Sequence, residues 1–228
     1  MSEWLTYGIG DFLLFSPRVY WRMFELHNRA VWPAQVPALL FGVVILVGVV
    51  RPRRWSDRAI PAILAAAWLW VAGSFLWVRY MTINWAAAYV VPAFVAEGLL
   101  VLVLGGLAGR LRVAVDGGVR GWIGLALFLY ALVAHPLVAL IGGRPLQVEI
   151  FGIAPDPLAI ATLGLLTLGT GGGVAWLLSV VPAMWCVISG VTLFALGAVE
   201  GWIPLVAVAI AATSRLWPTP DGRRSPVS

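Results

Sequence analysis

The sequence contains no lysine, one cysteine and two histidines. The missing lysine excludes proteins that hold retinal or pyridoxal phosphate as a Schiff base on a lysine side chain. The single cysteine, Cys186, excludes an intramolecular disulfide and any Cys-x-x-Cys metal or redox site. P-loop, GxSxG and HExxH motifs are also missing, and no nucleophile–base pair is evident, so the sequence argues against an enzyme.

Charged residues are scarce as well. They make up 11% of the 228 residues, whereas 61% are hydrophobic, and the mean hydropathy is +0.95. A soluble domain is about 45–50% apolar and about 25% charged, so lipid must solvate most of this chain. The ten-residue alternating segments typical of a membrane β-barrel are not seen. The composition therefore predicts an all-α, polytopic integral membrane protein in a lipid bilayer, with no nucleic-acid partner.

Long apolar runs predict about seven transmembrane helices, because about 20 apolar residues cross the hydrocarbon core. These runs cover residues 31–50, 59–78, 85–107, 122–141, 158–170, 174–196 and 202–216. The fifth and seventh runs are short, and only the glycine-rich turn 169–173 separates the fifth from the sixth. Six spans are therefore the alternative.

The first thirty residues predict an interfacial helix and its lead-in ahead of the transmembrane bundle of residues 31–217. Ser16 is a suitable N-cap, and Pro17 suits the first helical position. Apolar and charged residues then alternate at helical spacing, which is typical of an amphipathic helix at the membrane surface. This helix is either a simple anchor or a lid over an outer cavity. Residues 218–228 are polar and predict a disordered cytoplasmic tail.

The arginines predict the orientation. Most of the fifteen follow the first span, in RPRR at 51–54, or lie in loops on the same side. Because cytoplasmic loops carry the excess of basic residues, we expect the N-terminus outside and the C-terminus in the cytoplasm of a bacterial inner membrane.

Glu97 lies in the third predicted span. An ionisable residue inside the membrane is costly and marks a functional site by default. Pro92 removes a backbone hydrogen bond about one turn earlier, and small residues share the helical face of Glu97, which together favour a polar cavity. The alternative is a protonated Glu97 that holds a neighbouring helix through a hydrogen bond.

Further polar residues gather at the predicted outer ends of the spans. With Glu97 they form the candidate binding site, whose other members are Arg79, Tyr80, Asn84, His135, Glu149 and Asp156. We also expect Arg79 to pair with Glu149 or Asp156. These residues favour a small permease-like or solute-binding membrane protein with a polar pocket in its outer half around Glu97, where a small solute or ion would bind.

Two other functions stay open. His27 and His135 are candidate ligands for a metal ion or a haem, although the sequence requires no cofactor. The second alternative is a non-catalytic subunit or assembly factor that binds another membrane protein.

Three segments carry a resemblance to a known family. They are DFLLFSPRVYWRMFELHNRAVWPAQ, RYMTINWAAAY and EIFGIAPDPLAIATLG. With them the chain resembles an uncharacterised family, a domain of unknown function, of small bacterial multi-spanning inner-membrane proteins. The resemblance covers nearly the whole chain and implies an inner-membrane helical protein of about this length. It brings no activity with it.

Overall fold

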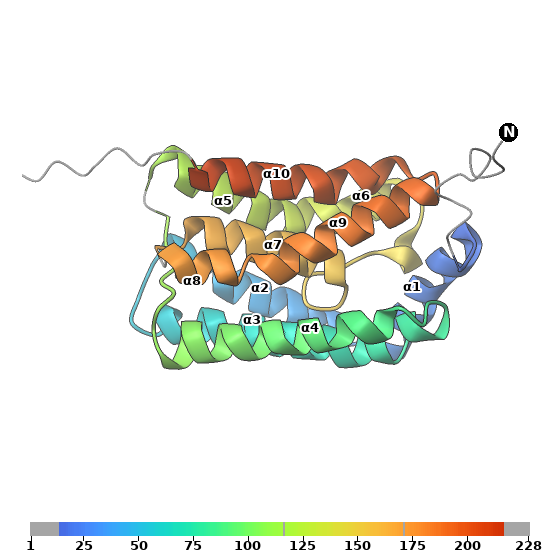
Figure 1. Cartoon of the computed structure of the whole chain (residues 1–228), viewed down its shortest axis with the longest axis horizontal. Helices are drawn as coiled ribbons and strands as arrows, with labels where there is room; N and C mark the ends of the chain where they lie inside the picture. Colours follow the sequence, from blue (N-terminus) through green and yellow to red (C-terminus); the bar gives the residue numbers. More distant parts are fainter. Residues whose placement is uncertain (1–13, 116, 171, 217–228) are drawn as a thin grey trace, which may run out of the picture.

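The computed structural model describes residues 14–115, 117–170 and 172–216, so the predicted tail at 218–228 lies outside the described residues. The described part is all-α (Figure 1). Its α-helices are α1 (Pro17–Val31), α2 (Gln35–Val50), α3 (Ser56–Trp70), α4 (Ala87–Leu100), α5 (Val119–Leu129), α6 (His135–Ile141), α7 (Pro155–Leu168), α8 (Gly172–Leu177), α9 (Val180–Ala195) and α10 (Trp202–Leu216). Turns of π-helix extend α3 and α4 and join α5 to α6, at Val71–Trp77, Val101–Leu107 and Tyr130–Ala134.

Five helical stretches of the described chain are long and apolar enough to cross a membrane. They are Ser56–Thr82, Ala87–Leu107, Val119–Ile141, Gly172–Ala195 and Val199–Leu216. The helices α1 and α2 meet the same criterion only when they are taken together as one span bent by 90°. The chain is therefore a multi-pass membrane protein with five or six candidate spans, and the prediction of seven is wrong.

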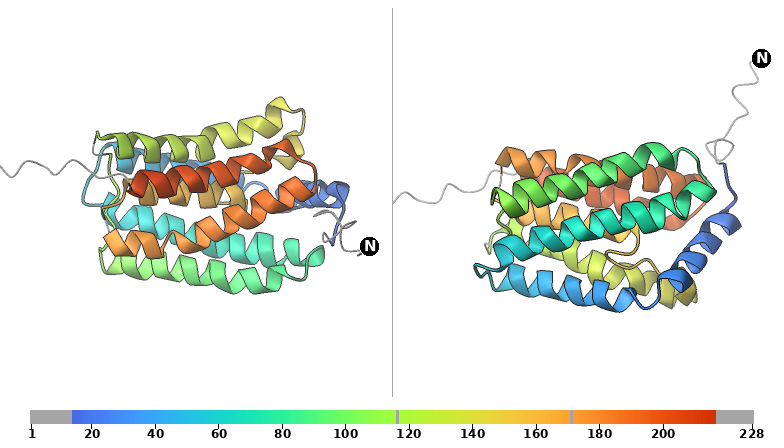
Figure 2. Two further views of the ribbon diagram at one scale, coloured as in Figure 1. Left: turned by 45° about the horizontal axis from the view of Figure 1, so that its top comes forward. Right: turned by 90° about the horizontal axis from the view of Figure 1, so that it is seen from below.

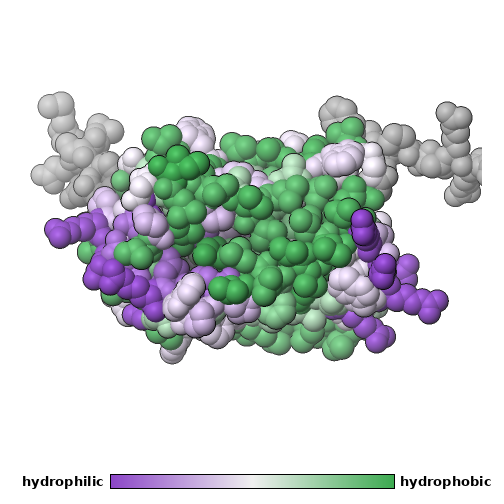
Figure 3. Space-filling view, turned by 180° about the vertical axis from the view of Figure 1, so that it is seen from behind, coloured by the Kyte–Doolittle hydropathy of each residue, from purple (hydrophilic) through white to green (hydrophobic). Residues whose placement is uncertain are grey.

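The surface agrees with this assignment. On the face that Figure 3 shows, hydrophobic residues cover the middle, and hydrophilic residues gather at the two ends. One end carries α1 and is called the α1 end below. At the opposite end, α5 begins and α10 finishes (Figure 1). Which end faces the cytoplasm stays a prediction from the arginine distribution.

The first predicted span, at α2, meets the criterion only together with α1, whereas the fifth predicted span fails at α7. This helix covers most of the fifth predicted span, but all fourteen of its residues are buried. At 1.5 Å per residue it is about 21 Å long, too short for a 30 Å hydrocarbon core. Figures 1 and 2 show it in the middle of the bundle with the longer helices around it. An apolar surface on every side suits the interior of a protein as well as lipid.

The helix α1 forms as predicted. The side chain of Ser16 accepts a hydrogen bond from the backbone nitrogen of Val19, and Pro17 occupies the first turn. The buried face consists of Tyr20, Met23, Phe24 and His27, at the spacing of a helical stripe. Figure 2 shows α1 at one end of the bundle, tilted away from the direction of the long helices.

Glycines and arginines hold α7 in place. A Cβ on Gly124 of α5 would lie 2.6 Å from the carbonyl oxygen of Gly164, so only glycine permits this close crossing of α5 and α7. At the carboxyl end of α7, Arg215 donates to the Leu166 oxygen at 2.6 Å, and Arg120 donates to the Thr167 oxygen at 2.8 Å. The last carbonyls of a helix lack partners within the helix and carry partial negative charge, which these guanidinium groups satisfy.

Candidate functional site

The candidate site begins where the chain turns into the bundle ahead of α7. After α6 the chain passes through a short turn, Pro145–Gln147, and then runs inward without regular structure over residues 148–154 (Figure 1). Gly152 has a φ of +74°, a backbone conformation that favours glycine. The nitrogens of Ile153 and Ala154 both donate to the Ile150 oxygen and close the turn. The helix α7 therefore starts inside the protein, and its first turn carries Asp156.

Asp156 is held by two donors from α9. Its Oδ1 accepts a hydrogen bond from Nε1 of Trp185 at 2.7 Å, and its Oδ2 accepts one from Oγ of Ser189 at 2.5 Å. The two donors are four residues apart and therefore share one face of α9. The carboxyl group also lies at the positive end of the α7 dipole, which favours a negative charge. Asp156 is only 2% exposed, yet both of its oxygens have partners.

Glu149 and His135 lie next to this carboxylate. Glu149 is buried in the loop ahead of α7, and its Oε2 is 3.9 Å from Nε2 of His135, the first residue of α6. This separation suits a charge interaction and is too long for a direct hydrogen bond. Within the described chain, Oε2 of Glu149 and Nδ1 of His135 have no hydrogen-bond partner. Buried polar atoms without partners indicate a place for water, an ion or a polar ligand.

A cavity of about 40 Å³ connects these groups. His135, Glu149 and Asp156 line it, together with Trp21, Arg144, Gln147 and Glu200 from the α1 end. A single water needs about 10–15 Å³ by this kind of measure, so the space suits a few waters or a small ion.

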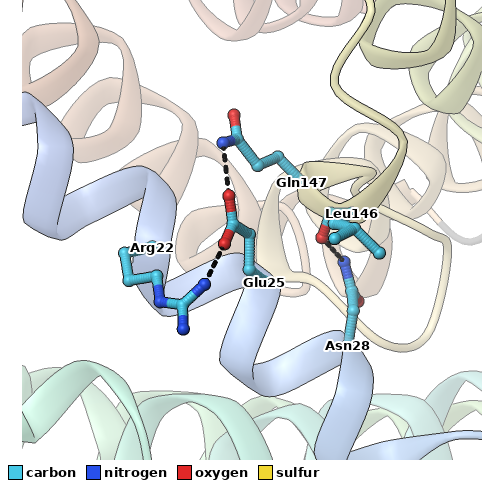
Figure 4. Close-up of polar contacts among 5 residues, drawn as sticks. All are labelled: Arg22, Glu25, Asn28, Leu146 and Gln147. Carbon is cyan, nitrogen blue, oxygen red and sulfur yellow. Dashed lines mark hydrogen bonds and ion pairs between the residues drawn. The ribbon is translucent and has the colours of Figure 1, made fainter.

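Polar contacts hold the α1 end of this cavity together. Arg144 donates to Oε1 of Glu200 at 2.6 Å, and its guanidinium group lies 5.0 Å from the centre of the Trp21 ring. On α1, Glu25 accepts hydrogen bonds from Gln147 at 2.9 Å and from Arg22 (Figure 4). These two bonds, with the larger effect from Gln147, lower the pKa of Glu25 below its usual value.

Asn28 adds a second connection between α1 and the loop. Its amide nitrogen donates to the backbone oxygens of Leu146, at 3.0 Å, and Val148, at 2.8 Å, and Figure 4 shows the first of these contacts. The helix α1 is thereby fixed over the start of the segment that leads to Asp156.

Of the seven residues predicted for the binding site, the structure brings His135, Glu149 and Asp156 together. Glu97 is completely buried in α4, and neither of its carboxyl oxygens has a hydrogen-bond partner in the described residues. Glu97 is not among the residues that line the cavity beside Asp156.

The turn before α4 has structural roles. Tyr80 is buried, with its ring 6.2 Å from that of Trp185. The amide group of Asn84 donates to the Tyr80 hydroxyl at 3.3 Å and accepts from the Ala86 nitrogen at 3.1 Å, so it stabilises the start of α4. Arg79 lies at the α1 end and lines a surface groove. The expected ion pair of Arg79 with Glu149 or Asp156 is not among the ion pairs of residues 14–216 that the structure describes.

The two histidines pack separately. The ring of His27 is 5.1 Å from that of Phe75, whereas the ring of His135 is 5.9 Å from that of Tyr130. His27 is 1% exposed, and both of its ring nitrogens lack a hydrogen-bond partner within the described chain. No group of three or more His, Cys, Asp or Glu residues among the described positions has a geometry that could hold a metal ion.

Comparison with known proteins gives one match. The model of a family described as "Family of unknown function (DUF6064)" matches residues 17–223. The chain belongs to this family. Neither the curated proteins nor the solved structures contain a match to it. The resemblance to a family without an established function is thus confirmed, and the match includes α1, the loop ahead of α7 and the candidate site. The bacterial source stays a prediction.

Several residues of the site were missed by the sequence analysis. Trp185 and Ser189 hold Asp156, while Gln147, Arg144 and Glu200 complete the cavity. The spacing of Trp185 and Ser189 was a usable signal, because two hydrogen-bond donors one turn apart in an apolar helix point at the same neighbour. Nothing in the sequence indicated that this neighbour is Asp156.

Proposed function

We propose that the protein is a small permease-like membrane protein that binds protons or a small cation in the cavity beside Asp156. The observation that carries the proposal is this cavity, which is lined by His135, Glu149 and Asp156. The proposal keeps the function expected from the sequence but moves its centre from Glu97 to Asp156.

The kind of ligand follows from the lining and the volume. Carboxyl groups and an imidazole are side chains that bind and release protons and that attract a cation. A cavity of about 40 Å³ has room for water or a small ion but not for a sugar or an amino acid. Since the described residues offer no metal-binding group of three or more ligands, protons suit the site better than a coordinated metal.

The helix arrangement supports the same function. Ionisable residues inside a membrane bundle are expensive and mark ion or proton pathways. Helices that start inside the bundle are a recurrent feature of transporters, where their positive N-terminal ends face anionic groups; in this protein that group is the Asp156 carboxylate. The helix α7 has this form, because an irregular segment carries the chain inward to its first turn at Pro155.

Infrared spectroscopy of the protein in lipid tests the binding step. We expect a carboxyl band that changes between about pH 5 and pH 8, where a site with histidine titrates. The Asp156→Asn variant should lose this change. The Asp57→Asn variant is the matched control, because Asp57 lies in the first turn of α3, at the opposite end from α1. Identical pH-dependent spectra for the protein and Asp156→Asn would overturn the assignment to Asp156.

Proton flux into liposomes tests the transport step. A potassium gradient with valinomycin provides the driving force, and a pH-sensitive dye inside the vesicles reports the flux. We expect faster acidification with the protein than in empty vesicles, and a rate near that of empty vesicles with Asp156→Asn. Glu97→Gln should retain the rate of the unchanged protein, because Glu97 does not line the cavity.

A further inference from the structure

A surface groove of about 750 Å³ lies at the α1 end, outside the cavity beside Asp156. It is lined by α1, by the turn between α3 and α4, and by the loop after α6. Four arginines line it, namely Arg18, Arg22, Arg79 and Arg144, and among the described lining residues the only carboxylate is that of Glu25. Guanidinium groups gathered around one carboxylate make the groove strongly positive.

Carboxylates of the described chain neutralise only part of this charge. Glu25 pairs with Arg22, and Glu200 pairs with Arg144. Arg18 and Arg79 have no ion pair with any described residue. As far as the described residues go, two guanidinium groups in the same groove are thus left for an anion.

The rest of the lining is apolar. Val19 and Leu26, both on α1, are 43% and 42% exposed and line the groove beside the arginines. Ile83, from the turn before α4, also lines the groove. A groove that offers guanidinium groups together with exposed aliphatic side chains suits an anion attached to a carbon skeleton better than a bare ion.

Arginine favours phosphate in particular. Its planar group donates two parallel hydrogen bonds to phosphate oxygens, which is why arginine is favoured where a phosphate is bound. We propose that the groove at the α1 end binds a phosphate group carried by an organic molecule, with Arg18 and Arg79 as its principal ligands. This site lies beside the proposed proton cavity and does not depend on it.

The groove also adjoins the cavity. Trp21, Arg144 and Gln147 line both of them. A phosphate in the groove would therefore lie next to the Arg144–Glu200 pair that stands at the α1 end of the cavity.

The phosphate has two possible sources, a soluble organic phosphate or the headgroup of an anionic phospholipid. For the first, glycerol 3-phosphate is titrated into the full-length protein in phospholipid-free detergent, and binding is measured by calorimetry. For the second, native mass spectrometry compares phosphatidylglycerol with phosphatidylcholine retained after release from nanodiscs. Saturable binding in the first experiment indicates a soluble ligand. Selective retention of phosphatidylglycerol alone indicates the headgroup.

Paired variants assign the binding to the groove. In Arg18→Gln/Arg79→Gln we expect at least about tenfold weaker binding, because each lost guanidinium removes charge-assisted hydrogen bonds. The matched control is Arg51→Gln/Arg54→Gln, which removes two exposed arginines after α2, at the opposite end. If the double variant at the groove is unfolded by size-exclusion chromatography, the single variant Arg79→Gln replaces it. The proposal is overturned if neither probe binds, or if the groove variant and the control variant bind equally well.

Discussion

Trp185 donates a 2.7 Å hydrogen bond from its indole nitrogen to Oδ1 of Asp156, and this bond joins the middle of α9 to the first turn of α7. Trp185 is 4% exposed, and the centre of its ring lies 5.2 Å from that of Phe94. The contact therefore combines a buried hydrogen bond to a carboxylate with aromatic packing. A phenylalanine at this position would keep the packing and lose the donor.

We predict that Trp185→Phe lowers the free energy of unfolding by about 1–3 kcal/mol, because a buried acceptor then lacks its partner. Ser189→Ala removes the second donor and should cost a similar amount. The effects should not add, since both donors serve the same carboxylate. Denaturant unfolding in detergent measures the free energy of unfolding of the unchanged protein, the two single variants and the double variant. Strictly additive effects would show that the two bonds act independently.

Arg215 supplies the second prediction. It donates to the Leu166 oxygen at 2.6 Å and to Ser179 Oγ at 2.6 Å, so it connects α10 to the carboxyl end of α7 and to the segment before α9. We predict that Arg215→Leu exposes the Leu166–Gly169 backbone to exchange and lowers stability by about 1–3 kcal/mol. Hydrogen–deuterium exchange with mass spectrometry follows these amides.

The control for this prediction is Arg110→Leu. Arg110 is exposed, lies in the same end of the molecule, and makes no side-chain hydrogen bond to another described residue. Equal exchange at the end of α7 in both variants would mean that Arg215 does not stabilise these carbonyls.

Gly164 supplies the third prediction. A Cβ at this position would lie 2.7 Å from the Gly124 oxygen and 2.8 Å from the Phe128 nitrogen. Because both atoms belong to backbone, α5 and α7 must separate to admit a methyl group. We predict that Gly164→Ala costs about 1–3 kcal/mol, the range for overpacking in a core. Gly73→Ala is the control, since a Cβ added there would have no described atom within 4 Å outside its chain neighbours and its own helix backbone. Equal midpoints of thermal unfolding for the two variants would contradict the close crossing.

These contacts show why the sequence predicted most of the helices but placed α7 wrongly. The runs of apolar residues located the spanning helices, since lipid requires such runs. The same composition serves a helix that is surrounded by protein, so hydropathy alone does not distinguish the environment of Leu165 from that of an apolar residue facing lipid. The short length of the run and the glycines at 124 and 164 are the features that separate the two cases.

The candidate site was predictable in part for a related reason. Ionisable residues stand out in an apolar chain, which is why His135, Glu149 and Asp156 were selected. Their grouping depends on the inward path of residues 148–154, and no local pattern specifies where that path leads. Glu97 stood out for the same reason, yet it lies outside the cavity lining.

Glu25 supplies the last prediction, which concerns pH. The hydrogen bond from Gln147, followed by the pairing with Arg22, lowers the pKa of Glu25 in the folded protein. Its contribution to stability is thus fully present above the usual glutamate pKa of about 4.3 and is lost as the pH falls through the lowered value. The contact that weakens is the one between α1 and the turn at Gln147, which stands at the α1 end of the cavity.

Unfolding temperatures of the protein and of Gln147→Ala, recorded from neutral to acid pH, test this linkage. The difference between them should be largest above about pH 4.3 and should shrink as Glu25 becomes protonated. The control repeats the comparison in the Glu25→Gln background, which lacks the titrating group. The difference in unfolding temperature between Glu25→Gln and Glu25→Gln/Gln147→Ala should not depend on pH. A difference that grows toward acid pH would mean that Gln147 stabilises the protonated form of Glu25, which contradicts the direction of the pKa shift.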